Sequence, residues 1–172
     1  DRDGLWIATR GGGLNRLDLP TGTVAHWSAT DHPTCVPGND LPAIASTPDG
    51  ALWLGSTDGG IARFDSTGQT CERFTPAHGL SHVDAVSLLP DPLGRLWIGS
   101  SNGLTLFDPG ARSITTFSHE AGLQGDIFTV SAHQLTARGA KLLGGTDGIN
   151  QFYPDRIAVD ETPPRVAITR LY

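Results

Sequence analysis

Histidine and carboxylate side chains are the groups in this 172-residue sequence whose spacing comes closest to a chemical site. His78, His82 and Asp84 lie within the stretch HGLSHVD, where two or three of them could bind a metal ion. Zinc, however, requires a fixed geometry and usually a further protein ligand or a water molecule. We therefore expect a solvated loop here, with no metal bound.

Other short motifs give weak chemical signals. The stretch TRGGGLN around residue 11 precedes a strand pattern, so it lacks the helix dipole with which such loops hold phosphate. Asp1 and Asp3 resemble the start of a calcium loop, but the glutamate that should close that loop is absent. Residues 99–103, GSSNG, match Gly-x-Ser-x-Gly only in the turn between two strand patterns, so they do not form the strand-to-helix nucleophile elbow, and neither cysteine stands in a recognised Cys/His pattern. The sequence thus predicts no catalytic residue, no cofactor and no enzyme.

Hairpins are the elements that would position any site. Residues 91–109, DPLGRLWIGSSNGLTLFDP, hold two apolar runs joined by Asn102 and Gly103, which predicts a β-hairpin with a type I′ turn. The pattern occurs four times, and the spacings are 47, 44 and 45 residues between Trp6, Trp53, Trp97 and Leu142. A strand-rich period of about 45 residues is typical of β-propeller blades, each a four-stranded antiparallel sheet.

Each repeat supplies the four strands of a blade. A spaced pair of apolar residues opens the innermost strand, the tryptophan strand is second, its hairpin partner third, and a short amphipathic run forms the outer strand. We expect the tryptophans to be buried between blades, with small residues such as Gly55 and Gly99 on the opposite face of the strand. The alternative is a set of exposed tryptophans that stack on sugars or bases.

The strand ends indicate where a ligand site would lie. Hairpin turns and the connections between blades emerge at the same end of such a meander. The candidate ligand-binding residues are three that precede the spaced apolar pairs, nearest the axis, and three in the hairpin turns farther out: Asp40, His82 and Asp126, and Asp58, Asn102 and Asp147. The alternative role of the inner three is to cap backbone N–H groups at strand starts.

Composition narrows the possible partners. With 12 basic and 18 acidic residues, a net charge of -6 and no basic cluster, the chain is not expected to bind nucleic acid. No apolar run approaches the roughly 20 residues that span a bilayer, so we expect membrane attachment only through a parent protein. The two cysteines, Cys35 and Cys71, either form one disulfide in an oxidising compartment or remain free thiols.

The stretch AHGLSHVDAVSLLPDPLGRLWIGSSNGLTLFDP resembles the repeat of the two-component regulator propeller family. The closing stretch GGTDGINQFYPDRIAVDETPPRVAITRLY resembles the last blade of that family leading into an immunoglobulin-like domain. The resemblance implies an all-β protein with about four propeller blades, approximately at 1–39, 40–81, 82–125 and 126–155, and a linker with the first strand of the next domain at 156–172.

The family also implies a function. Its propellers are the ligand-sensing, extracytoplasmic parts of membrane proteins whose output is a histidine kinase or a cyclic-dinucleotide synthase. We therefore expect a periplasmic or extracellular, non-enzymatic sensor module that binds an unknown small molecule or a glycan. A lyase-like propeller enzyme with a site on one end of the blades and a pure protein-interaction scaffold are the alternatives.

The remaining expectation concerns whether the blades close into a ring. The chain has no methionine and begins at the second strand of its first copy, which predicts an excised, C-terminal portion of a larger propeller. Such a portion has uncovered blade faces, so self-association should follow. A four-bladed ring closed on itself is the alternative.

Overall fold

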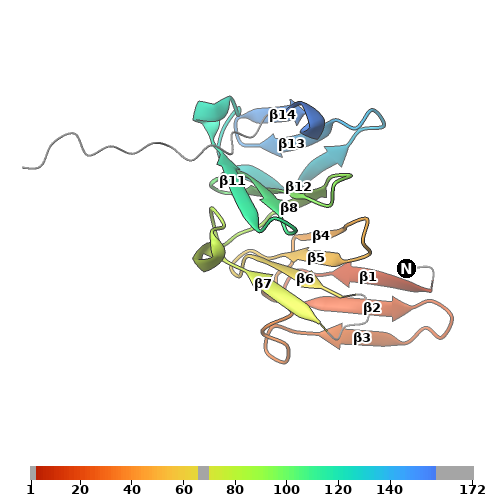
Figure 1. Cartoon of the computed structure of the whole chain (residues 1–172). Coiled ribbons are helices and arrows are strands. Elements are labelled where there is room, and N and C mark those ends of the chain that lie inside the picture. The colour runs from red at the N-terminus through yellow and green to blue at the C-terminus, as the bar shows by residue number, and fades with distance from the viewer. Residues whose placement is uncertain (1–2, 66–69, 158–172) are drawn as a thin grey trace, which may run out of the picture.

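The computed structural model describes residues 3–65 and 70–157, which form four antiparallel sheets (Figure 1). We call these sheets blades one to four in chain order. The strands are β1 (Gly4–Ala8), β2 (Leu14–Asp18) and β3 (Val24–Trp27); β4 (Ala43–Ser46), β5 (Leu52–Gly55), β6 (Ile61–Phe64) and β7 (Cys71–Phe74); β8 (Ser87–Pro90), β9 (Leu96–Ser100), β10 (Gly103–Asp108) and β11 (Ser113–Phe117); and β12 (Phe128–Leu135), β13 (Lys141–Gly145) and β14 (Gly148–Phe152).

The only helical elements among the described residues are three 3₁₀ turns: η1 (Pro76–His78), η2 (His119–Ala121) and η3 (Pro154–Arg156). The all-β, propeller-blade prediction is thus confirmed. No helix in the described ranges is long and apolar enough to cross a membrane. The expected start of an immunoglobulin-like domain falls almost entirely on residues 158–172, which lie outside the described residues.

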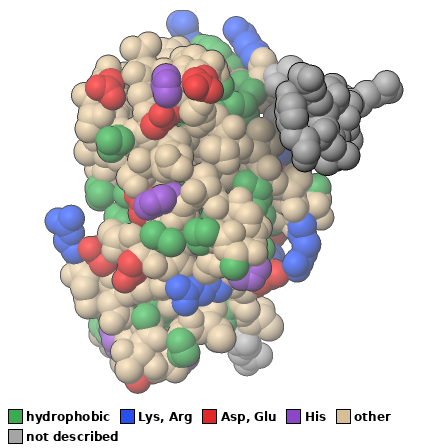
Figure 2. Space-filling model, turned by 90° about the vertical axis from the view of Figure 1, so that its left-hand side faces the viewer, with side chains coloured by type: hydrophobic (Ala, Val, Ile, Leu, Met, Phe, Trp, Pro, Cys, Tyr) green, Lys and Arg blue, Asp and Glu red, His purple; other side chains and the backbone are tan. Residues whose placement is uncertain are grey.

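Within each blade the strands pair in sequence order, so the blade is a simple meander. The repeated tryptophans Trp6, Trp53 and Trp97 lie in equivalent strands, β1, β5 and β9, and Leu142 holds that place in β13. Hairpin turns such as that between β5 and β6, and the connections between blades, emerge at the left of Figure 1, and Figure 2 looks onto this end. The turns β4–β5, β8–β9 and β12–β13 lie at the opposite end.

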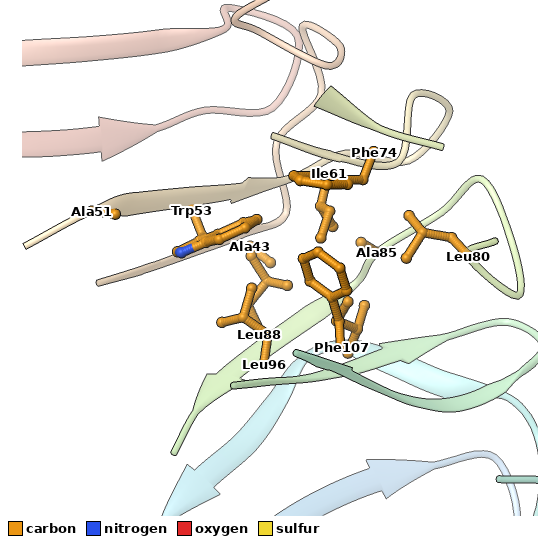
Figure 3. Packing of buried hydrophobic residues seen from close by; sticks show 11 residues of the cluster. Ala43, Ala51, Trp53, Ile61, Phe74, Leu80, Ala85, Leu88, Leu96 and Phe107 are labelled. Carbon is orange, nitrogen blue, oxygen red and sulfur yellow. The ribbon is translucent and has the colours of Figure 1, made fainter. Parts of the chain in front are cut away.

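The hydrophobic core lies between the blades. Trp53 from blade two points toward Leu88 and Leu96 of blade three, and Phe107 fills the neighbouring space (Figure 3). Trp53 and Trp97 are both fully buried, at 0% exposure. The prediction of structural tryptophans is therefore confirmed, and the alternative of an exposed stacking platform is wrong for these two residues.

The expected placement of the small residues was wrong. Residues two apart in a strand share a face, so Gly99 lies on the same side as Trp97, toward blade four. A Cβ atom on Gly99 would come within 3.1 Å of Leu143 and 3.2 Å of Phe128. A large side chain, Trp97, and a residue without one, Gly99, therefore alternate along one face of the strand, because blade four packs closely against the strand beside the indole ring.

The turn type in blade three also differs from the prediction. A type I′ turn needs a positive φ at both central residues. Here Ser101 and Asn102 are central, neither has a positive φ, and only Gly103 does, at 97°. The geometry is that of a turn followed by a left-handed glycine, and this arrangement frees the Gly103 N–H to point at the next blade.

A disulfide joins Cys35 to Cys71, with Cα atoms 4.9 Å apart. It links the segment between blades one and two to the outer strand β7. Of the two alternatives left by the sequence, the structure therefore has the disulfide.

Candidate functional site

A repeated hydrogen bond between blades defines which positions are equivalent. The N–H of Gly13 donates to the carbonyl of Asn39 (2.8 Å), that of Gly60 to Val83 (2.6 Å) and that of Gly103 to Asp126 (2.7 Å). The three predicted inner residues are therefore not equivalent to one another. Asp40 comes one residue after this position, His82 one residue before it, and only Asp126 occupies it, because the apolar pairs used for the alignment sit in different registers.

Two of the inner carboxylates form exposed pairs. Asp40 lies 3.9 Å from the guanidinium of Arg10. Asp126 accepts hydrogen bonds from the backbone N–H of His119 (2.6 Å) and lies 2.7 Å from its Nδ1. The side-chain bond to Asp126 raises the pKa of His119, and the same bond lowers the pKa of Asp126. This pair ties η2 to the start of blade four.

His82 contacts Asp84 through its Nδ1 atom. The second oxygen of Asp84 accepts the backbone N–H of Ser101 (2.9 Å), and the Ser101 hydroxyl donates to the first oxygen (3.1 Å). Asp84 thus fastens the entry to blade three to its own hairpin turn. Across the described ranges, no three histidine, cysteine or acidic side chains converge on a metal-binding geometry.

The three predicted turn residues, Asp58, Asn102 and Asp147, are exposed and lie in the hairpin turns of successive blades. Histidine and acidic side chains gather at separate places on this end of the molecule (Figure 2). Each predicted inner residue adjoins the hairpin turn of its own blade: the Asp40 carbonyl accepts the N–H of Thr57, the Ser101 hydroxyl lies 3.4 Å from Nδ1 of His82, and a Cβ atom on Gly125 would meet the side chain of Asp147. None of the six predicted residues lines either cavity described below. Ligand binding by these residues stays a prediction.

A larger cleft opens at the opposite end, where the first turn of blades two, three and four meets the segment after β14. Its volume is about 770 Å³, within the range of small-molecule sites. The lining consists of residues 46–48, 90–92 and 153–156, with Leu135, Arg138, Gly139 and Lys141. We call it the turn-end cleft.

Lys141 is the unusual residue of the turn-end cleft. Its pairing in the sheet places it where Leu52 and Leu96 stand in blades two and three. The side chain is only 1% exposed, and Nζ donates a hydrogen bond to the carbonyl of Pro90 over 2.6 Å. Burial lowers the pKa of Lys141, and the nearby charge of Asp91 opposes that effect.

Lys141 is not among the residues predicted from the sequence, although the sequence carries a signal for it. In the fourth repeat, KLLGG aligns with LWLG and LWIG, so a charged residue replaces a leucine at a core position. A lysine is almost never fully buried unless it is paired.

Positive charge predominates in the turn-end cleft. The buried carboxylate of Asp91 is already bound by the Arg95 guanidinium at 2.8 Å. Arg138 and Arg156 are exposed at the rim, and Arg156 lies over the ring of Tyr153, 4.3 Å from its centroid. Within residues 3–65 and 70–157, neither these two arginines nor Lys141 forms an ion pair.

A second cavity, of about 430 Å³, lies between blades three and four. Its wall includes Trp97, whose Nε1 is buried without a hydrogen-bond partner, whereas Nε1 of Trp53 donates to Oγ1 of Thr47 at 3.2 Å. Asp91 stands in the place of Thr47 in blade three, and its carboxylate is held by Arg95. The threonine hydroxyl that accepts from the indole of Trp53 therefore has no counterpart in blade three.

Comparison with known proteins agrees with this architecture. The family described as "Two component regulator propeller" matches residues 79–102. A curated relative, histidine kinase P4 of Formosa agariphila, is 27% identical over 103 residues, which are 59% of this chain and 8% of that protein.

Solved structures show the same fold. The extracellular domain of the putative hybrid two-component system BT4673 from B. thetaiotaomicron gives a TM-score of 0.75 at 22% identity, covering 92% of this chain and 22% of that one. The corresponding domain of BT3049 from the same organism gives 0.68 at 24% identity, covering 90% and 19%. This chain therefore spans about a fifth of these structures. Residues 79–102 thus match the two-component regulator propeller repeat, and the blades have the fold of the extracellular domains of these putative two-component systems.

Proposed function

We propose that this chain is the ligand-sensing part of a periplasmic or extracellular, membrane-anchored signalling protein, and that the turn-end cleft holds the ligand. The cleft itself carries the proposal, because it combines a suitable volume with a buried, incompletely paired lysine. The similarity to extracellular sensor domains and to a histidine kinase supports the signalling role. The Cys35–Cys71 disulfide is in keeping with an oxidising compartment.

We infer that the module is not an enzyme. The serine, histidine and aspartate that lie together, Ser101, His82 and Asp84, do not have the arrangement of a catalytic triad. Both Ser101 and Asp84 contact the same nitrogen, Nδ1 of His82, whereas a triad places the nucleophile and the acid on opposite nitrogens.

The outer face of blade one supports a further partner proposal. Leu5 and Ile7 are 52% and 38% exposed, yet the equivalent residues of the next two blades are buried against the preceding blade. Those equivalents are Leu52, Leu54, Leu96 and Ile98, at 8%, 0%, 0% and 3%.

Blade four shows the same feature on its other face. Ile149 is 69% exposed, whereas the equivalent residues Ile61 and Leu104 are 0% and 1% exposed, packed on the following blade. Both outer faces thus have the side chains that the repeat elsewhere uses between blades. We propose that each packs against another blade of this kind, which for the isolated chain means head-to-tail self-association.

A thermal-shift screen tests the sensing proposal. A panel of neutral and charged sugars and metabolites is added to the chain, because a ligand that binds only the folded state raises the melting temperature. Any stabilising compound is then tested on Leu135→Trp, which fills the cleft from an exposed position, and on Leu19→Trp in blade one as the control. Stabilisation that is lost only in Leu135→Trp supports the proposal. No stabilising compound, or equal stabilisation of both variants, contradicts it.

A further inference from the structure

We infer that the turn-end cleft recognises an anionic group, a carboxylate or a sulfate, and that Lys141 is the residue that binds it. This inference rests on the proposed function, since it names the class of ligand for the same cleft. The position of Lys141 in the repeat is the starting point. A leucine satisfies the packing in blades two and three, so packing alone does not require an ammonium group in blade four.

The hydrogen bonds of Lys141 are incomplete. An ammonium group has three donors, and the Pro90 carbonyl accepts one of them. A buried charge is costly unless it is paired and hydrogen-bonded. Asp91, the nearest candidate to neutralise it, is committed to Arg95 and to the backbone N–H groups of Leu93 and Arg95. An acidic group of a ligand in the cleft would supply the missing counter-charge.

The rim and walls indicate an organic anion rather than a bare inorganic ion. Arg138 and Arg156 add positive charge at the entrance, where Asp155 is the acidic residue. The walls include the ring of Tyr153 and the apolar faces of Pro48 and Pro92. At about 770 Å³ the cleft is far larger than a single ion, so apolar contacts would hold the body of the ligand while Lys141 binds its acidic group.

Three probes with one sugar ring separate charge from shape: glucose, glucuronate and glucose 6-sulfate. Their binding to the chain is measured by isothermal titration calorimetry, with Lys141→Met as the test variant. Met fits a position that accepts leucine in the other blades, so this variant should fold. Arg112→Gln removes the same charge from an exposed ion pair with Glu72 outside the cleft and is the matched control.

We expect at least one of the two anions to bind more tightly than glucose, and Lys141→Met to weaken it by about 10- to 100-fold, the range for a hydrogen bond to a charged group. Arg112→Gln should bind as the unmodified chain does. Preference for glucuronate identifies a carboxylate site, and preference for glucose 6-sulfate a sulfate site.

Three outcomes overturn the inference. They are equal affinity for glucose and the anions, an anion affinity that Lys141→Met leaves unchanged, and no binding of either anion. The proposed function is judged separately. If a neutral compound from the thermal-shift panel raises the melting temperature of the chain and this increase is lost in Leu135→Trp, the sensing proposal stands and an anionic ligand is excluded.

Discussion

Lys141 donates a hydrogen bond from Nζ to the backbone carbonyl of Pro90 at 2.6 Å, and so links the second strand of blade four to the innermost strand of blade three. The equivalent contacts in the other blades are made by leucine side chains in an apolar core. One interface of the repeat therefore contains a buried charge that the other two lack.

Replacing this charge should not destabilise the fold. We expect Lys141→Met to leave the free energy of unfolding unchanged or to raise it, because a buried ammonium group without a paired counter-charge is costly and methionine removes that cost. Denaturant titration measures this. A loss above about 1 kcal/mol would show that the ammonium is required for packing.

The same residue predicts a pH dependence. Because burial lowers the pKa of Lys141, the unfolded chain binds more protons between the folded-state pKa and the ordinary value of about 10.4. The stability of the unmodified chain should therefore rise with pH across that window, relative to Lys141→Met. Equal pH profiles in denaturant titrations of the two proteins would contradict the expectation.

The buried tryptophans should dominate stability. Trp53→Ala or Trp97→Ala should lower the free energy of unfolding by about 3–5 kcal/mol, the usual cost of emptying a large aromatic site. Leu93→Ala, at a residue that is 77% exposed, is the control and should change it by less than about 0.5 kcal/mol. Losses below about 1 kcal/mol for both tryptophans would argue against their role between blades.

The disulfide should add stability by restricting the unfolded chain. Its cysteines are 36 residues apart, so Cys35→Ser should cost on the order of 4 kcal/mol. Mass spectrometry of the alkylated, unreduced chain checks that the bond forms, and denaturant titration measures its contribution. Two alkylated thiols in protein isolated from an oxidising compartment would be the contrary result.

His119 should report on its contact with Asp126. NMR titration should give a pKa above the ordinary histidine value, and Asp126→Asn should bring it back toward that value, whereas Asp18→Asn in blade one should not. Because the folded-state pKa is raised, the stabilisation is complete below about pH 6.5 and is lost as the pH rises through the folded-state pKa. An unchanged His119 pKa in Asp126→Asn would show that the pair does not form in solution.

The outer faces predict association that depends on concentration. Light scattering over a concentration series should show dimers or larger species, and Leu5→Glu or Ile149→Glu should shift the chain to monomer because either variant places a charge on one apolar face. Leu93→Glu, in the exposed turn between β8 and β9, should not. A compact monomer at every concentration would rule out the head-to-tail proposal.

The sequence by itself determined the repeat, the strand types and the burial of Trp53 and Trp97, because these depend on local periodicity that recurs about every 45 residues. The tertiary structure decided what depends on register between blades. It showed that Asp40, His82 and Asp126 are not equivalent and that Gly99 shares a face with Trp97. It also brought Lys141 to Pro90, 51 residues earlier in the chain, and joined Cys35 to Cys71. Such contacts depend on how one sheet packs against the next, and the sequence of a single repeat does not encode that packing.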